Sequence, residues 1–225
     1  MVFKALIYKS TGTWYTCRDL LGREWKGRIR GKLKTDKEIS STNPIAVGDW
    51  VHLEPEDEQE SSAMIQDIYA RKNYLVRTSP HNKRLKHIVA ANLDQNILLC
   101  TLRDPRTSTG FIDRFLVSSE AYHIPAMLFF NKADSFHEED ELEFLRLKTM
   151  YEEAGYKVVK ISALSGEGME EVRHLLQHKQ SVLTGHSGVG KSTLINALLP
   201  QKDIKTQQVS EWSGKGMHTT TFAEM

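Results

Sequence analysis

The residues whose chemistry is clearest form a glycine-rich stretch near the end of the chain. Positions 185–192 read Gly-His-Ser-Gly-Val-Gly-Lys-Ser, the complete pattern of a phosphate-binding loop. The glycines allow backbone N–H groups to surround phosphate oxygens, and the positive end of a following helix adds to the attraction. We expect Lys191 to reach the β- and γ-phosphates and the hydroxyl of Ser192 to bind Mg²⁺. The alternative is a glycine turn that only caps a helix.

The sequence around this loop also suits a phosphate site. A short apolar strand is expected at 181–184, and the helix expected at 193–199 ends before Pro200. The loop does not identify the base, because its pattern also resembles that of guanylate kinases, which transfer a phosphoryl group to a nucleotide. The predicted nucleotide contacts in this region are Gly185, His186, Ser187, Gly188, Val189, Gly190, Lys191, Ser192 and Thr193.

A second polar segment, Asn131-Lys132-Ala133-Asp134, directly follows an expected buried strand, where open α/β sheets bind ligands. The Asp134 carboxylate can accept hydrogen bonds from guanine N1–H and the exocyclic amine, whereas adenine offers a lone pair and a C–H there. Such a site rejects the wrong base by roughly 10⁴ or more. Asn131 would bridge guanine N7 and the phosphate loop, and the Lys132 stem would cover the ring. The alternative is a solvated loop.

A third segment, Ser162-Ala163-Leu164, follows the next expected strand and resembles the GTPase segment whose backbone N–H contacts guanine O6. Taken alone, it could also be a helix N-cap at Ser162 or Ser165. All three segments fall directly after expected strands, which favours a guanine nucleotide as the ligand. Their order is the reverse of that in ordinary GTPases, because the base-reading residues precede the phosphate loop. The sequence therefore predicts a circularly permuted GTPase domain.

A glycine-rich stretch with several hydroxyl groups, Ser213–Thr221, stands where a first switch segment belongs. A threonine there would complete the Mg²⁺ shell and sense the γ-phosphate. We expect Thr219 or Thr220 to take this role. A plain flexible loop is the alternative.

Strands and helices alternate from about residue 92 onwards, which is typical of a doubly wound α/β sheet. The expected strands are 96–102, 126–130, 156–161 and 181–184. Helices are expected around 112–116, at 139–154 and around 169–176. The 139–154 helix is expected to point Leu142, Leu145 and Met150 inward.

The first 70 or so residues have the pattern of short strands separated by glycines, which favours an OB-type barrel over another small β-domain. The expected strands are 3–8, 13–17, 28–33, 50–53 and 63–69. We predict an OB-like RNA-binding domain at 1–72 and a GTPase domain at 73–225. A basic stripe, with Trp25 as a stacking residue, would follow RNA phosphates, and a solvated face is the alternative. The stripe comprises Arg23, Lys26, Arg28, Arg30, Lys32 and Lys34.

The composition is ordinary for a soluble protein, with 225 residues, 40% hydrophobic, 26% charged and a net charge of +1. No window approaches the roughly 18 apolar residues of a membrane helix. The amino terminus lacks the pattern of a signal peptide, so we expect a cytoplasmic protein with no membrane partner. Cys17 and Cys100 lie in separate regions, which predicts neither a disulfide framework nor a zinc cage.

Together these motifs resemble the RsgA (YjeQ/YloQ) family of ribosome small subunit-dependent GTPases. The resemblance rests on the phosphate loop, on Gly-Lys-Gly-x-His-Thr-Thr at 214–220, and on the barrel segments 28–33 and 43–50. It implies hydrolysis of GTP to GDP and phosphate with Mg²⁺, in late maturation of the small (30S) ribosomal subunit, whose rRNA the barrel would hold. An apolar residue replaces the usual water-positioning glutamine in this family. His218 is therefore the expected catalytic substitute, acting with Lys191 in a monomer that the subunit stimulates.

The chain departs from the family pattern at its end. The family continues with an Asp-Thr-Pro-Gly segment and a Cys/His module that binds Zn²⁺, and the ligands of that module are absent here. The chain has one Asp-x-x-Gly match, Asp19–Gly22, which lies in the barrel and is expected to be a turn. We therefore expect hydrolysis by this chain to be impaired. The alternative function is a noncatalytic rRNA-binding module with a vestigial nucleotide site, although an intact Asp134 and Lys191 argue against it. A guanylate-kinase-like transferase is a third hypothesis.

Overall fold

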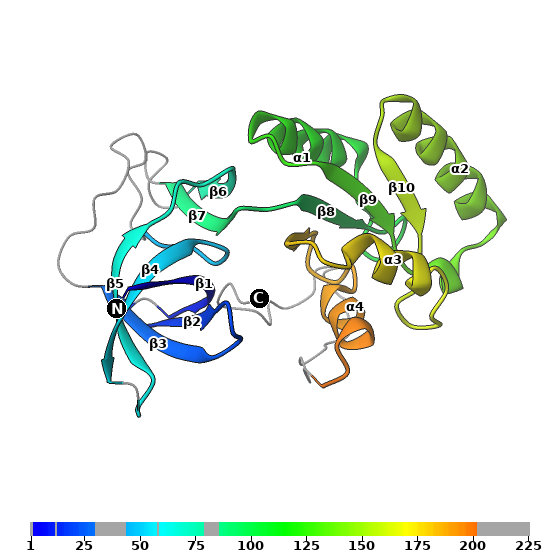
Figure 1. Cartoon of the computed structure of the whole chain (residues 1–225). Coiled ribbons are helices and arrows are strands. Elements are labelled where there is room, and N and C mark those ends of the chain that lie inside the picture. Colours follow the sequence, from blue (N-terminus) through cyan, green and yellow to red (C-terminus); the bar gives the residue numbers. More distant parts are fainter. Residues whose placement is uncertain (1, 12, 30–43, 58, 79–85, 202–225) are drawn as a thin grey trace. The chain divides into compact units, whose positions relative to one another are not determined.

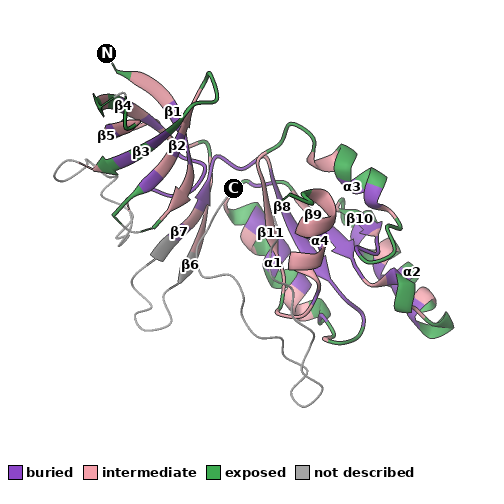
Figure 2. Ribbon diagram, turned by 90° about the horizontal axis from the view of Figure 1, so that it is seen from below, coloured by how far each residue is buried: buried purple, intermediate pink, exposed green. Residues whose placement is uncertain are grey.

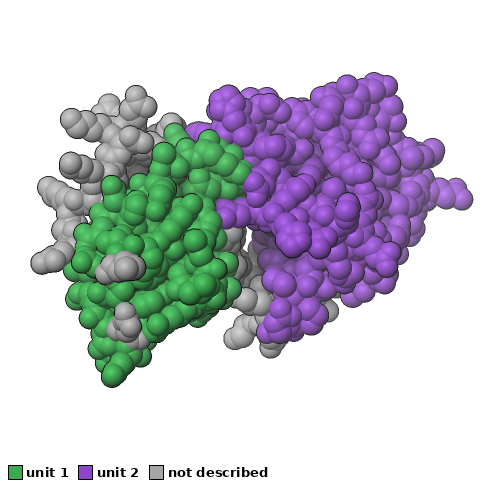
Figure 3. Space-filling view, in the orientation of Figure 1, with its two compact units in different colours: residues 1–93, 220–225 green, residues 94–219 purple. Residues whose placement is uncertain are grey.

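The computed structural model describes residues 2–11, 13–29, 44–57, 59–78 and 86–201. They fall into two compact units, which divide between Leu93 and Asp94 (Figure 3). The predicted switch segment at 213–221, with His218, Thr219 and Thr220, lies outside the described residues.

The first unit contains a closed five-stranded barrel with the strand order β1-β2-β3-β5-β4, which confirms the predicted OB-type fold (Figure 1). Its strands are β1 (Phe3–Ser10), β2 (Tyr15–Asp19), β3 (Glu24–Ile29), β4 (Trp50–Asp57) and β5 (Ser62–Ile68). Neighbouring strands are antiparallel except β3 and β5, which pair in parallel. Alternate side chains point inward and form the barrel core, which includes Ile7, Tyr15, Val51 and Ile65.

The third barrel strand corrects the sequence prediction. Among the described residues it spans Glu24–Ile29, so it begins four residues before the predicted start at 28, and positions 30–33 lie outside the described residues. Trp25 belongs to the core with 4% of its surface exposed. The indole Nε1–H of Trp25 donates to Asp19 at 3.0 Å, so its one polar group is paired inside the barrel wall. Trp25 therefore cannot be the RNA-stacking residue that the basic stripe predicted, because a buried ring offers no face to a base.

The Asp19–Gly22 segment is the predicted turn between β2 and β3. One carboxylate oxygen of Asp19 accepts the backbone N–H groups of Leu21 at 2.9 Å and Arg23 at 3.0 Å. Gly22 has a φ of +83°, which glycine adopts without the strain that a side chain would add. This segment is thus a barrel hairpin and not a γ-phosphate sensor.

A two-stranded antiparallel sheet, β6 (Tyr74–Thr78) and β7 (Lys86–Ala91), completes the first unit. Its end is joined to the barrel by hydrogen bonds from the Ala91 N–H to Val47 and from the Asn92 side chain to Gly48, both at 2.9 Å. The compact unit therefore extends to residue 93, whereas the sequence boundary was placed after residue 72. That domain boundary stays a prediction.

An ion pair in this junction is almost entirely out of water. The Arg71 guanidinium makes two contacts of 2.7 Å with the Asp49 carboxylate, whose side chain is 0% exposed. The same carboxylate accepts the Ala46 N–H at 2.8 Å. One of the basic residues of the sequence is therefore used internally and is not available to a partner.

The second unit contains a parallel sheet with the order β10-β9-β8-β11. Its strands are β8 (Gln95–Cys100), β9 (Ala126–Phe130), β10 (Lys157–Lys160) and β11 (Ser181–Thr184). Its helices are α1 (Thr109–Ala121), α2 (Glu138–Glu153), α3 (Met169–Leu176) and α4 (Lys191–Leu198), with a short 3₁₀ helix η1 (Ala133–Ser135). The alternation of strands and helices along the chain confirms the predicted α/β class. The two strands expected at 126–130 and 181–184 have the predicted bounds.

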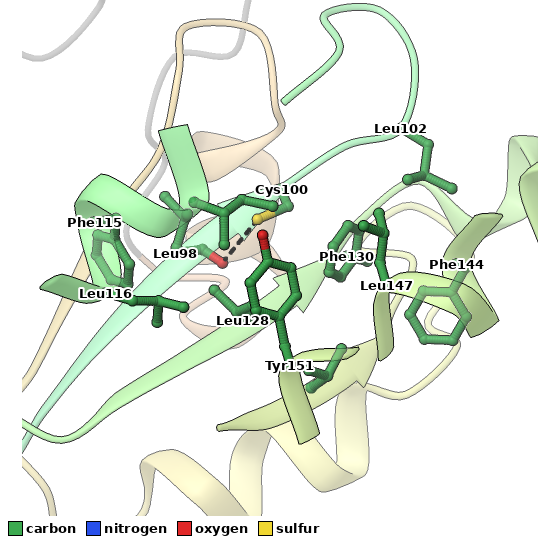
Figure 4. Close-up of a cluster of buried hydrophobic side chains, with 12 residues drawn as sticks. Leu98, Cys100, Leu102, Phe115, Leu116, Leu128, Phe130, Phe144, Leu147 and Tyr151 are labelled. Atoms are coloured by element: carbon green, nitrogen blue, oxygen red, sulfur yellow. Dashed lines mark hydrogen bonds between the residues drawn. The ribbon is translucent and has the colours of Figure 1, made fainter. Parts of the chain in front are cut away.

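Side chains alternate across this sheet and form two cores, one on each face. Leu98, Leu128 and Phe130 pack with α1 and α2, and Figure 4 shows this cluster. Ile97, Leu99 and Phe129 pack on the other face with α3 and α4. Strands β8 and β9 are consequently almost fully buried and β11 is half-buried, while the outer sides of the helices are exposed (Figure 2).

Helix α2 buries a different face from the one predicted. Leu142 and Leu145 are 70% and 55% exposed, and Met150 is also exposed. Phe144, Leu147 and Tyr151 face the sheet instead. Two large rings bury more apolar area than the leucines would, and the Tyr151 hydroxyl donates to Asp113 at 2.9 Å. The helical period was correct, but the phase of the buried stripe was wrong.

No helix within the described ranges is both long and apolar enough to cross a membrane. Cys17 and Cys100 are free thiols, one inside the barrel and one inside the sheet core.

Candidate nucleotide-binding site

The three polar segments found in the sequence all begin at the carboxyl ends of parallel strands in the second unit. Asn131 follows β9, Ile161 and Ser162 follow β10, and Gly185 follows β11. Because parallel strands end at the same edge of a sheet, the segments share one edge, which is where ligands bind in this class of fold.

Asn131 connects the three segments directly. Its side-chain amide donates to the Val189 carbonyl of the phosphate loop at 2.8 Å, and its side-chain oxygen accepts the Ala163 N–H at 3.0 Å. Only 3% of Asn131 is exposed, so these bonds satisfy polar groups that water does not reach. The predicted bridge from Asn131 to the phosphate loop is thus present, while its contact with guanine N7 stays a prediction.

Asp134 lies on η1 and is exposed at the same edge. The Ser162 hydroxyl donates to Oδ1 of Asp134 and also accepts the Ser165 N–H at 3.0 Å. A carboxylate oxygen has two lone pairs, so this contact orients Asp134 without using up its capacity to accept from a base. Ser162 therefore both stabilises the turn of its own loop and positions Asp134. It is not the N-cap of a helix, because α3 begins at Met169 with Gly168 as its N-cap, and the contact of the 162–163 backbone with guanine O6 stays a prediction.

Lys132 adopts the left-handed conformation, with a φ of +69°, and its ammonium donates to the backbone carbonyl of Asp104. Burial lowers the pKa of Lys132, and the nearby charges of Asp104 and Asp134 act in the opposite direction. Fixing the ammonium at one end holds the methylene stem in place. Such a stem can cover one face of a purine, as the sequence predicted.

The phosphate loop has positive φ angles at two of its glycines, a backbone conformation that glycine adopts readily. Gly188 and Gly190 have φ values of +87° and +96°, and Gly190 is the N-cap of α4 without a side-chain hydrogen bond to the helix. The N–H groups of the first turn of α4 therefore have no capping side chain to displace when a phosphate approaches. This arrangement fits a phosphate group.

Lys191 lies within reach of the same loop. Its ammonium donates to the carbonyls of Gly185 at 2.9 Å and His186 at 2.6 Å, and burial lowers its pKa. In the part of the chain that the structure describes, no carboxylate forms an ion pair with Lys191. A half-buried cation held only by backbone carbonyls is suited to bind phosphate oxygens.

Two glycines are required by close packing as well as by conformation. A Cβ at Gly185 would come within 2.7 Å of the Leu99 carbonyl oxygen. A Cβ at Gly190 would collide with the side-chain nitrogen of Asn131. The phosphate loop and the base-reading segment thus approach each other so closely that glycine is needed between them.

The predicted metal and catalytic residues are only partly described. Ser192 is half-buried in the first turn of α4, and no group of three or more acidic, histidine or cysteine ligands gathers anywhere in the described ranges. A single hydroxyl fits Mg²⁺, which in nucleotide sites keeps several waters and takes other ligands from the phosphates. Thr219, Thr220 and His218 lie outside the described residues, and their roles stay predictions.

The sequence did not indicate the segment between β8 and α1, residues 101–108, which together with the first turn of α1 reaches both parts of the site. The Asp104 carbonyl accepts from Lys132, and the Phe111 ring lies 3.9 Å from the His186 ring of the phosphate loop. The segment carries no binding motif. Its only available signal was its position after a central strand, which becomes visible once the strand order is known.

Comparison with known proteins agrees with this geometry. The fold and the order of the three segments define the chain as a circularly permuted GTPase. A family model described as RsgA GTPase matches residues 68–225, and another described as RsgA N-terminal domain matches residues 4–63. The chain belongs to the RsgA GTPase family.

Individual relatives cover nearly the whole chain. The "Small ribosomal subunit biogenesis GTPase RsgA" of Bacteroides fragilis strain YCH46 is 49% identical over 223 residues, which are 99% of this chain and 71% of that protein. The protein of the same name from Flavobacterium psychrophilum is 47% identical, over 98% of this chain and 68% of its own length.

Two solved structures have the same fold. That of YjeQ from Thermotoga maritima is 31% identical with a TM-score of 0.74, over 96% of this chain and 73% of its own. That of YloQ, described as a circularly permuted GTPase, is 26% identical with a TM-score of 0.68, over 96% and 69%. The predicted family, fold class and GTPase activity class are confirmed, and the family implies GTP or GDP and Mg²⁺ as ligands.

Proposed function

We propose that this chain binds and hydrolyses GTP during biogenesis of the small ribosomal subunit. The observation that carries the proposal is the Asn131 side chain, which joins the base-reading segment to the phosphate loop at 2.8 Å. A single nucleotide can therefore contact both. This observation also favours GTP hydrolysis over a guanylate-kinase-like transfer, because such a transferase would not require the base-reading segment to lie beside the phosphate loop.

Each predicted residue has a proposed role in this site. Asp134 accepts from guanine N1–H and the exocyclic amine, Lys132 covers the ring, and the backbone at Ser162–Ala163 reads guanine O6. Lys191 and the N–H groups from Gly185 to Thr193 hold the phosphates. Mg²⁺, when bound, neutralises charge on the β- and γ-phosphates, with Ser192 and a threonine at 219 or 220 as its ligands. His218 places the attacking water.

Hydrolysis measured with ribosomal subunits tests the proposal. We expect the full chain to release phosphate from GTP faster when small ribosomal subunits are added, and not when large subunits are added at the same concentration. ATP should be a poor substrate because it cannot pair with Asp134. No release of phosphate with or without subunits, together with retained subunit binding, would instead support the noncatalytic rRNA-binding module. Phosphoryl transfer to GMP would support the kinase-like transferase.

We also propose that the barrel contacts rRNA, but through fewer charges than the basic stripe contains. Arg28 is held by two hydrogen bonds of 2.9 and 3.0 Å to Glu56, and Trp25 is buried. Lys26 lies two residues away on the same outward face of β3, is exposed, and has no ion-pair partner among the described residues. Arg30, Lys32 and Lys34 lie outside the described residues.

Lys26 and Arg28 form a matched pair for testing this surface. Lys26→Gln should weaken binding to small subunits and reduce the slope of log affinity against log salt by about 1, the value for one phosphate contact. Arg28→Gln should change the slope less, because Glu56 already neutralises that guanidinium. Binding by filter retention across a salt series measures both. Equal slopes for Lys26→Gln and the parent chain would remove Lys26 from the proposed interface.

The remaining proposals concern the state of the protein in the cell. We propose a monomer, which sedimentation equilibrium tests, and a cytoplasmic location beside assembling subunits, which cell fractionation tests.

A further inference from the structure

The segment that joins β8 to α1 contacts the predicted nucleotide site at two separate places. This segment, residues 101–108, is called the β8–α1 loop below, taken together with the first three residues of α1, 109–111. It follows β8, which lies between β9 and β11 in the sheet. The base-reading residues follow β9 and the phosphate loop follows β11, so a loop that leaves β8 emerges between them.

The first contact is made by a backbone atom. The Asp104 carbonyl accepts a hydrogen bond from the Lys132 ammonium, although the carboxylates of Asp104 and Asp134 are both close enough to attract that ammonium. A carbonyl is a fixed acceptor, whereas an exposed carboxylate can rotate. The position of the Lys132 stem therefore depends on the conformation of the loop.

The loop is held in shape by two buried threonines. The Thr107 hydroxyl accepts the Thr101 N–H at 3.0 Å, and the Thr107 N–H donates to the Thr101 carbonyl at 2.8 Å. The Thr101 hydroxyl also donates to the Pro105 carbonyl. Thr101 and Thr107 are 0% and 5% exposed. These bonds close the loop around Asp104.

A salt bridge fixes the outer side of the same loop. Arg103 donates to the Asp140 carboxylate at 2.6 Å, and the other oxygen of Asp140 accepts the His137 N–H at 2.9 Å at the start of α2. The loop is thus attached to the helix that follows the base-reading segment.

The second contact is between two rings. Phe111, in the first turn of α1, lies with its ring centroid 3.9 Å from that of His186, at an angle of 35° between the planes. The His186 carbonyl is one of the two acceptors for Lys191, at 2.6 Å. Phe111 therefore holds the side chain of a residue whose backbone contacts the phosphate-binding lysine.

We propose that the β8–α1 loop is a positioning element of the nucleotide site, in which Thr107 sets the place of Lys132 through Asp104 and Phe111 sets the phosphate loop through His186. This inference rests on the proposed function, because it assigns residues to the same guanine nucleotide site. Neither residue touches the nucleotide in this scheme. Each acts through a residue that does.

Affinities for GDP and IDP in the full chain test the base side. Thr107→Val keeps the shape of the side chain but removes the acceptor for the Thr101 N–H, and a lost buried hydrogen bond corresponds to about tenfold in an equilibrium. We expect both affinities to fall about tenfold with their ratio unchanged, because Asp134 still reads the 2-amino group that IDP lacks. A changed ratio would show that the substitution disturbs Asp134 itself, whereas a general loss of the folded site would lower both affinities equally and also lower the melting temperature of the unliganded variant.

Three variants test the phosphate side. Phe111→Leu should weaken GDP and GTP binding by about three- to tenfold, the range for one lost aromatic pair. Phe111→Tyr retains the ring and should bind as the parent chain does. Tyr156→Leu is the control, because Tyr156 packs against the same sheet core as Phe111 but makes no contact with the phosphate loop, and it should leave nucleotide affinity unchanged.

The outcomes separate this inference from the proposed function. If the parent chain binds no GDP, the proposed function fails and the inference fails with it. If the parent chain binds GDP and both Thr107→Val and Phe111→Leu bind it equally well, only the inference is overturned. If Phe111→Tyr or Tyr156→Leu loses as much affinity as Phe111→Leu, core disruption explains the loss and the role of the Phe111 ring is rejected. Melting temperatures of the unliganded variants identify any that fail to fold.

Discussion

Replacing Asp134 by asparagine should change the preferred base from guanine to xanthine. The carboxylate of Asp134 accepts two N–H groups from guanine, whereas an asparagine amide can accept only one and turns a donor towards the exocyclic amine. Xanthine carries a carbonyl at that position, which the amide N–H matches. We expect GDP affinity to fall by roughly 10³ or more and XDP to become the tighter ligand, as measured by competition against a fluorescent guanine nucleotide.

The surroundings of Asp134 make this substitution specific. The Ser162 hydroxyl that contacts Asp134 can also donate to the asparagine oxygen, so the loop is expected to keep its shape. Glu138→Gln, in the exposed first turn of α2, removes a nearby negative charge without touching the site and should leave the preference for GDP intact. A chain with Asp134→Asn that still prefers GDP would show that Asp134 does not read the base.

Gly190→Ala should nearly abolish nucleotide binding. The added Cβ meets the side-chain nitrogen of Asn131, and the φ of +96° at this position is unfavourable for any residue with a side chain. The backbone cost of about 1–2 kcal/mol and the loss of a buried hydrogen bond worth about 1–3 kcal/mol together correspond to a loss of affinity between roughly 30-fold and several thousand-fold. Titration calorimetry with GDP would measure the loss.

Gly155→Ala isolates the part of this effect that comes from crowding. Gly155 has a φ of +91° at the end of α2, but a Cβ there meets nothing within 4 Å. Its substitution should lower the free energy of unfolding by about 1–2 kcal/mol and leave GDP affinity unchanged. Similar GDP affinities for the two variants would mean that the close contact between Gly190 and Asn131 is unimportant for binding.

The parts of the site that could be predicted are those whose chemistry depends on residues next to each other in the sequence. The phosphate loop requires glycines at fixed spacing, and the base-reading segment requires Asp134 three residues after Asn131. When a strand precedes each motif, the backbone at the end of that strand fixes most of the geometry of the binding site. The structure therefore places Asn131, Ser162 and the phosphate loop together at one sheet edge, as expected.

The predictions that were wrong depended on competition between side chains. Helix α2 has two apolar stripes, one with Leu142 and one with Phe144. Only packing against Phe130 determines that the stripe with Phe144 is the buried one. In β3, Trp25 was assigned to a basic surface because its neighbours are charged, but strand alternation turns it inward. Local pattern gives the period of an amphipathic element, whereas the phase depends on which residues fill the core best.

The β8–α1 loop could not have been found from the sequence for another reason. Asp104 acts through its carbonyl, which every residue has, so no residue type marks it. The contact of Phe111 with His186 joins positions 75 residues apart and requires β8 to lie beside β11. Such contacts become predictable only after the order of strands in the sheet is known.

The pairing of β11 with β8 also has a consequence for biosynthesis. The strands β8, β9 and β10 lie side by side and leave the ribosome before β11, so three of the four strands can assemble while the rest of the chain is still being made. Asn131 acquires its partner at Val189 only when 58 further residues have been added. During translation the nascent chain thus has its base-recognition half first, and becomes able to hold a nucleotide only after its last described strand has docked.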